Sequence, residues 1–154
     1  MSTTAASFQA ILKETFSAIE AGADGTWFVQ GNEGFYDAID GLSAEEASVQ
    51  LAPDVSSIAA HTDHTRYYLW TTNAYLRGER VVDDWPGSWK NQTVDEAQWQ
   101  DIKAGLRHEV NTLLGSADKL FEEGKPCIGA FANVAHAAFH LGAVRQLLRL
   151  VKGR

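Results

Sequence analysis

Four stretches of the chain repeat apolar residues every three or four positions, and glycine or proline separates each stretch from the next. This spacing places the apolar side chains on one face of an α-helix. We therefore predict helices over residues 7–21, 55–77, 95–122 and 128–152. Because each apolar face must be buried against another element, four such helices without a convincing sheet predict an all-α four-helix bundle.

Local signals set the ends of these helices. Pro53 and Asp54 provide a stop and an N-cap before the second helix, and Gly78 ends it. Thr93 and Glu96 have the spacing of a capping box, in which each side chain satisfies a backbone N–H at the start of the third helix.

The first connection, residues 22–53, is long and contains five glycines, which break a long helix. We interpret it as a long, partly ordered crossover connection. Within it, the composition is compatible with a short strand at residues 27–29 and with a helical turn at residues 35–42.

The connection at residues 78–92 is polar but contains Trp85 and Trp89. Together with a proline and a glycine between them, these residues are typical of a structured loop rather than a helix. The two tryptophans are expected either to wall a pocket or to cover one end of the bundle.

The length and charge limit the function classes. A chain of 154 residues fits one domain, so residues 1–154 are expected to share one core. The net charge of -7 gives no support to binding of nucleic acid, which needs clustered lysine and arginine to meet phosphates. A small-molecule substrate suits this charge better.

The sequence also predicts a cytoplasmic protein with no membrane span. No apolar run approaches the roughly 20 residues that cross a bilayer, and the first residues lack the basic and apolar regions of a secretory signal. Cys127 is the only cysteine, so no internal disulfide can form, and we expect it to be a small buried apolar residue. Dimerisation through an exposed helix face is compatible with so small a bundle.

The most informative motif is a pair of histidines in the fourth helix, His136 and His140. Residues four apart stand on one helix face, about 5–6 Å apart at Cβ. Both histidines belong to the apolar stripe that continues through Val144, Leu147 and Val151, so both are expected to face the interior. Two inward imidazoles each need a partner for a donor and an acceptor, and a shared metal ion satisfies that need.

The second helix supplies His61 and His64. On a helical projection, His61 lies nearer the apolar stripe, whereas His64 lies on a flank beside Tyr68 and Tyr75. We therefore predict a metal site formed by His61, His136 and His140, with His64 either near the ligands or solvated. A single inward histidine is usually a hydrogen-bonded core residue, but three on facing stripes favour a metal.

A set of three histidines leaves a position open for water or substrate, which is typical of a catalytic metal rather than a structural one. Such an ion lowers the pKa of its bound ligand. Imidazole ligands suit Zn, Ni, Cu or Fe and do not choose among them. Asp63 and Asn133 are candidates to hydrogen-bond the ligands, and no further residue is assigned to catalysis.

Two segments of the chain, residues 57–68 around His61 and residues 136–142 around the helix-four pair, resemble the DinB/YfiT-like superfamily of metal-dependent four-helix-bundle proteins. The resemblance extends over essentially the whole chain and implies that His61, His136 and His140 hold one divalent ion, Zn or Ni. The family often has Gly-Gln-Ile after the last histidine, whereas this chain has Gly142-Ala143-Val144.

The resemblance also implies an activity, because relatives include thiol-dependent transferases. It suggests an ion that activates water or a low-molecular-weight thiol for attack on an electrophile, as a transferase or hydrolase. The alternative is a protein without catalytic activity that binds a ligand or serves in a stress response.

Overall fold

A computed structural model describes residues 2–17, 27–29, 33–122 and 128–153. Within these ranges the chain is all-α, with seven α-helices, one 3-10 helix and no strand. The elements are α1 (Thr3–Phe16), α2 (Phe35–Ile39), α3 (Ala44–Ala47), α4 (Ile58–Leu76), the 3-10 helix η1 (Gly87–Trp89), α5 (Glu96–Gly115), α6 (Ala117–Leu120) and α7 (Ile128–Lys152).

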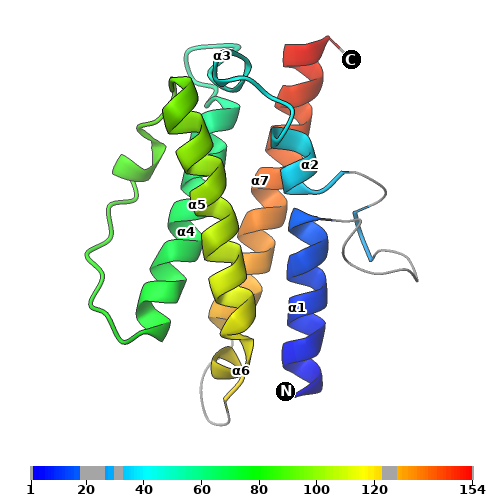
Figure 1. The fold of residues 1–154 in the computed structure, drawn as a ribbon, viewed down its shortest axis with the longest axis vertical. Coiled ribbons are helices and arrows are strands. Elements are labelled where there is room, and N and C mark those ends of the chain that lie inside the picture. Colours follow the sequence, from blue (N-terminus) through cyan, green and yellow to red (C-terminus); the bar gives the residue numbers. More distant parts are fainter. Residues whose placement is uncertain (1, 18–26, 30–32, 123–127, 154) are drawn as a thin grey trace.

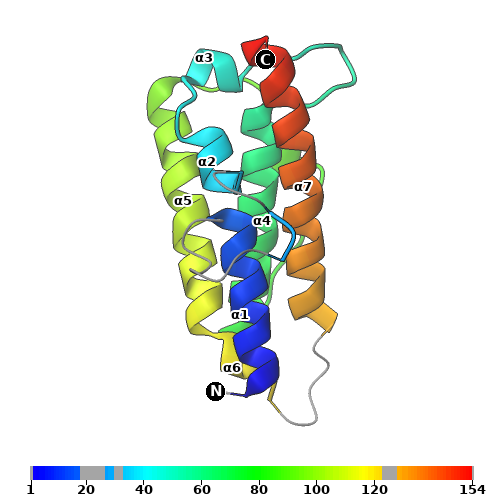
Figure 2. The same ribbon diagram turned by 90° about the vertical axis from the view of Figure 1, so that its right-hand side faces the viewer.

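Four long helices, α1, α4, α5 and α7, lie side by side (Figure 1, Figure 2). α4 packs against α5 and α7, and α1 packs against α7. α4 and α5 run in the same direction, and α1 and α7 run in the opposite one (Figure 1). The segment between α4 and α5 therefore returns along the length of α4, on the side that faces away from α1 (Figure 1).

The predicted fourth helix is confirmed at both ends as α7. The first helix begins earlier than predicted, at Thr3, because the Ser2 hydroxyl accepts a hydrogen bond from the N–H of Ala5 at 3.1 Å. It ends at Phe16 rather than residue 21, and residues 18–26 lie outside the described part of the chain.

The second and third predicted helices have different caps from those expected. α4 begins at Ile58, capped by the hydroxyl of Ser57 rather than by Asp54. α5 is capped by Asp95, which forms the capping box with Gln98, so the box predicted at Thr93 is wrong. In both cases a later side chain can reach the free N–H groups of the first turn.

The third helix is also shorter than predicted. α5 ends at Gly115, and the chain turns at Ser116 before the separate short helix α6. The predicted end at residue 122 is therefore wrong. A glycine at this position lowers the helical propensity where the turn occurs.

The first connection contains α2 and α3, and the predicted helical turn near residues 35–42 is confirmed as α2. The predicted strand at residues 27–29 is wrong. The N–H groups of these residues donate instead to the carboxylate of Glu14, at 2.8, 2.5 and 2.7 Å. The connection that runs back between parallel helices is the one after α4, whereas the sequence pattern predicted a crossover in the first link (Figure 1).

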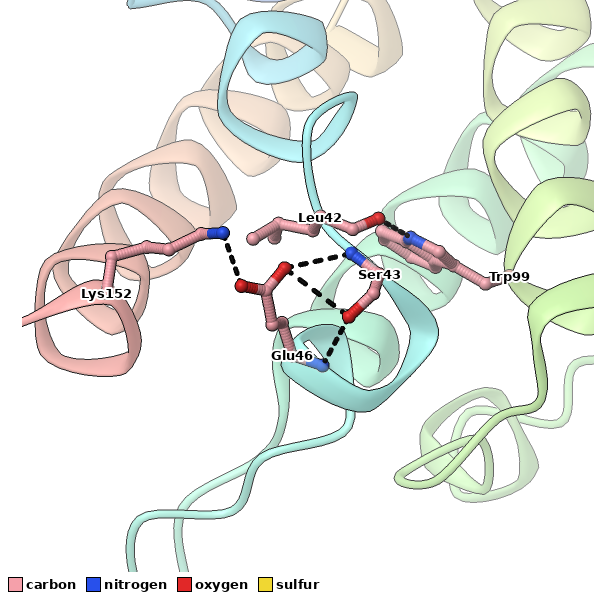
Figure 3. Close-up of polar contacts among 5 residues, drawn as sticks. All are labelled: Leu42, Ser43, Glu46, Trp99 and Lys152. Atoms are coloured by element: carbon pink, nitrogen blue, oxygen red, sulfur yellow. Dashed lines mark hydrogen bonds and ion pairs between the residues drawn. The ribbon is translucent and has the colours of Figure 1, made fainter.

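The segment around α3 is fixed to two long helices (Figure 3). Ser43 and Glu46 form a capping box, with bonds of 3.2 and 3.0 Å between each side chain and the other's N–H. Glu46 also pairs with Lys152 near the end of α7. The indole N–H of Trp99 on α5 donates to the carbonyl of Leu42 at 2.9 Å.

All four long helices contribute side chains to the apolar core. The largest fully buried apolar side chains are Trp99, Phe16, Phe35, Leu12, Ile39, Ile58, Leu69, Leu106, Leu113, Val29 and Val144. Among the described residues, every helix is too short or too polar to traverse a bilayer.

Candidate metal centre

One histidine of α4 and two of α7 converge in the interior. His64, His136 and His140 each offer a ligand atom, and these atoms lie within 4.8 Å of one another. Nε2 of His136 is 3.1 Å from Nε2 of His64 and 3.2 Å from Nε2 of His140. The arrangement follows from the four-residue spacing on α7 and from the packing of α4 against that helix.

These distances fit a tetrahedral metal site. With metal–nitrogen bonds of about 2.0–2.1 Å, two ligands of a tetrahedral zinc site lie about 3.3–3.4 Å apart. The two Nε2–Nε2 distances of 3.1 and 3.2 Å are close to that value. Because Nε2 of His136 lies close to Nε2 of both other rings, one ion can accept a lone pair from each of the three, and His64, His136 and His140 together can hold a divalent metal.

The hydrogen bonds of His64 leave its Nε2 free of a proton. The hydroxyl of Ser88 lies 2.6 Å from the carbonyl oxygen of Trp85 and 2.7 Å from Nδ1 of His64. A carbonyl only accepts, so the single hydroxyl hydrogen of Ser88 points to Trp85, and Nδ1 of His64 must donate to Ser88. The neutral ring therefore carries its proton on Nδ1 and presents the Nε2 lone pair to His136.

The histidines of the cluster are neutral at physiological pH. Burial lowers the pKa of His136 to about 4 and that of His140 to about 3, and repulsion from neighbouring histidines adds to both shifts. Burial also lowers the pKa of His64, although the nearby Asp63 opposes this shift. Neutral imidazoles bind a divalent ion without first losing a proton.

Aromatic rings cover the histidines. His64 stacks on Trp89 with 4.0 Å between ring centroids, and His136 stacks on Tyr68 with 3.9 Å. Trp89 also meets His61 edge to face at 5.2 Å. The rings fix the planes of the imidazoles and exclude water from these faces, which strengthens electrostatic interactions at the cluster.

The loop that carries Trp89 is anchored to α4 by polar contacts. The amide of Asn91 donates to Asp63 at 2.6 Å, and Arg66 donates to the other carboxylate oxygen at 2.7 Å. The side-chain oxygen of Gln92 accepts from the N–H of Ser57 at 2.9 Å. These contacts hold the 3-10 helix over the histidines.

The predicted metal site and the close set in the structure both contain His136 and His140, but they differ in the third histidine. The close set contains His64, whereas Nδ1 of His61 lies 2.9 Å from Nδ1 of His140 and outside that set. The alternative that His64 is solvated is wrong, because only 7% of His64 is exposed, while His61 is half-buried. A helical projection considers only helices, and here the loop from Trp85 to Gln92 buries His64.

Ser88 is the site residue that the sequence analysis missed, since no spacing signal connects a loop serine with a histidine 24 residues earlier. Asp63 accepts hydrogen bonds from Arg66 and Asn91, and the amide of Asn133 donates to Thr72 on α4 and to Gly129 on its own helix. His108 is exposed and lies outside the cluster. The expectation for Cys127 lies outside the described residues.

Comparison of the chain with protein-family models, with curated proteins and with solved structures found no match.

Proposed function

We propose that this chain is a metal-dependent enzyme of the DinB/YfiT-like four-helix-bundle type, and that His64, His136 and His140 hold one zinc or nickel ion. When bound, the ion supplies Lewis acidity and lowers the pKa of a water or low-molecular-weight thiol. The proposed reaction is attack of that nucleophile on a small electrophile, as in a thiol transferase or a hydrolase.

The observation that carries this proposal is the composition of the close group, which, within the described part of the chain, contains three neutral imidazoles and no carboxylate or thiol. Three neutral ligands leave the charge of a divalent ion uncompensated and a coordination position open. An uncompensated charge favours an anionic ligand, such as a thiolate or hydroxide, over its neutral acid. Imidazole ligands suit both zinc and nickel.

The chain's own residues would orient and shield this centre. Ser88 keeps the proton of His64 on Nδ1, so that its Nε2 lone pair faces the other two histidines. Trp89 and Tyr68 lie on the ring faces of His64 and His136 and keep water away from them. Hydrogen bonds to the far nitrogen of a metal-binding histidine commonly raise its affinity for the ion.

The family part of the proposal rests on the two histidine motifs and on their location in the fold. The motif near His61 and His64 lies on α4, and the motif of His136 and His140 lies on α7, which packs against α4. Four long helices with histidines on two that pack together support a four-helix bundle with a central metal.

The first test is elemental analysis of protein purified without added metal and without an affinity tag. We expect about one zinc or nickel ion per chain, lost in His136→Ala and in His140→Ala. The exposed His108→Ala is the matched control and should keep its metal. Wild-type protein that holds no ion after incubation with either metal would refute the proposed centre.

The second test separates an enzyme from a metal carrier. Metal-loaded protein is incubated with a panel of low-molecular-weight thiols and a chromogenic electrophile, and product is measured with and without a chelator. Turnover that disappears with the chelator and returns with added zinc or nickel supports the enzyme. Stoichiometric metal without turnover of any thiol or of water would contradict it.

A further inference from the structure

His61 lies beside the metal-binding group without belonging to it. Its Nδ1 is 2.9 Å from Nδ1 of His140, a hydrogen-bond distance. Nε2 of His140, on the opposite side of that ring, is 3.2 Å from Nε2 of His136. His140 therefore bridges two neighbours, with one ring nitrogen toward the close group and the other toward His61.

The protons of the two rings follow from this arrangement. A neutral imidazole has one N–H and one lone pair, so a bond between two Nδ1 atoms needs one donor and one acceptor. If Nε2 of His140 gives its lone pair to a metal, then Nδ1 of His140 carries the proton and is the donor. Nδ1 of His61 is then the acceptor, and the proton of His61 lies on Nε2.

We propose that His61 is a positioning residue, which accepts the Nδ1–H of His140 and so holds the Nε2 lone pair of His140 toward the metal-binding group. This inference rests on the proposed metal centre. Ser88 has the same relation to His64, since it takes the Nδ1 proton of that ring. Two of the three ligands would thus have their tautomer fixed by a neighbour, His61 for one and Ser88 for the other.

The geometry separates this role from that of a direct ligand. The lone pairs of the two nitrogens of one imidazole point out of the ring in widely different directions. An ion bound at Nε2 of His140 therefore does not lie at its Nδ1, where His61 is found. His61 also meets Trp89 edge to face at 5.2 Å, which holds its ring beside His140.

The test compares His61→Ala and His61→Gln with His64→Ala and His140→Ala. Metal content is measured by elemental analysis, and zinc affinity by competition with a chromophoric chelator. We expect His61→Ala to keep one ion per chain but to bind it about 10–100-fold more weakly, the usual effect of losing a partner of a metal-bound histidine. His61→Gln provides an amide oxygen as acceptor and should recover much of the affinity. His64→Ala and His140→Ala should lose the ion.

The visible spectrum of the cobalt-substituted protein gives a readout independent of activity. A positioning role predicts that His61→Ala retains the band intensity and shape of the wild type, because the ligands are the same. Loss of the ion in His61→Ala together with full retention in His64→Ala would overturn the inference, while metal loss in His140→Ala would still support the proposed centre.

The hydrogen bond itself can be measured in metal-free protein by the ring ¹⁵N shifts of the histidines. We expect His140 to carry its proton on Nδ1 in the wild type and to populate both tautomers in His61→Ala. An Nε2–H tautomer of His140 in the wild type would overturn the inference whether or not a metal binds.

Discussion

The imidazole of His64 lies nearly parallel to the indole of Trp89, with 4.0 Å between ring centroids and 20° between planes. His64 belongs to α4, whereas Trp89 ends the 3-10 helix in the loop after α4. The same indole meets His61 and His140 at 5.2 and 5.6 Å. The proposed centre is therefore built from two long helices and a loop, and Trp89 contacts histidines from both helices.

This contact predicts that Trp89 reports metal binding. Titration of nickel or cobalt into chelator-treated protein should quench tryptophan fluorescence, because these open-shell ions quench an indole that lies a few ångströms away. The quenching should saturate near one ion per chain. In Trp89→Phe, most of it should disappear, although Trp85 at 6.3 Å from His64 leaves a residual signal.

Trp27→Phe is the control for this titration, since Trp27 is 81% exposed. It should lower the total emission and leave unchanged the absolute amount of emission that the ion removes. Equal fractional quenching in Trp89→Phe and in wild type would contradict a metal site beneath Trp89.

Ser88→Ala should weaken metal binding without changing its stoichiometry. The substitution removes the acceptor for Nδ1–H of His64 and lets the ring adopt the tautomer with its proton on Nε2, where the ion would bind. We expect an affinity loss of about 10–100-fold, measured by chelator competition. Ser7→Ala, at an exposed serine of α1, should leave the affinity unchanged. An unchanged affinity in Ser88→Ala would refute the assigned role.

The sequence pattern correctly predicted features that are determined within a single helix. Both ends of α7 and the shared face of His136 and His140 follow from periodicity within 25 residues. The choice between His61 and His64 does not, because it depends on which flank of α4 the following loop covers. That loop is fixed by long-range contacts such as Asn91 with Asp63, which no local pattern reveals.

The misplaced helix starts have a related cause. Thr93 and Glu96 match the capping-box spacing as well as Asp95 and Gln98 do, so the pattern alone does not choose between them. The choice follows from tertiary contacts, because the carboxylate of Glu96 does not accept from the N–H of Thr93 and instead accepts from the N–H of Ala44 at 3.1 Å. The contact between α5 and the segment before α4 therefore decides which of the two possible capping boxes forms.

Gly78→Ala should destabilise the protein by about 1–2 kcal/mol, the usual strain of a side chain in the left-handed region. Gly78 follows α4 with φ of 80°, and the N–H of Glu79 bonds to the carbonyl of Ala74 across it at 3.0 Å. Urea unfolding followed by circular dichroism measures the change. Gly41→Ala is a matched control, because Gly41 has no positive φ and a Cβ there meets no atom within 4 Å. A cost at Gly41 equal to that at Gly78 would contradict backbone strain as the cause.

Glu14→Gln should cost about 1–3 kcal/mol of unfolding free energy at pH 7, since the amide keeps only one oxygen and leaves at least one of the three N–H groups of residues 27–29 without an acceptor. Burial raises the pKa of Glu14. The hydrogen bonds from the N–H groups of Phe28, Val29 and Trp27 together lower it by more, so the net pKa lies below the usual 4.5. Above pH 4.5 the carboxylate is ionised in both states and contributes fully. As the pH falls from there through the folded-state pKa, the unfolded chain takes up the proton first and the contribution is lost.

The stability difference between wild type and Glu14→Gln should therefore narrow below pH 4.5, whereas the exposed Glu45→Gln should show little difference at any pH. A difference that stays constant down to pH 3 would mean that Glu14 does not stabilise the fold through its charge.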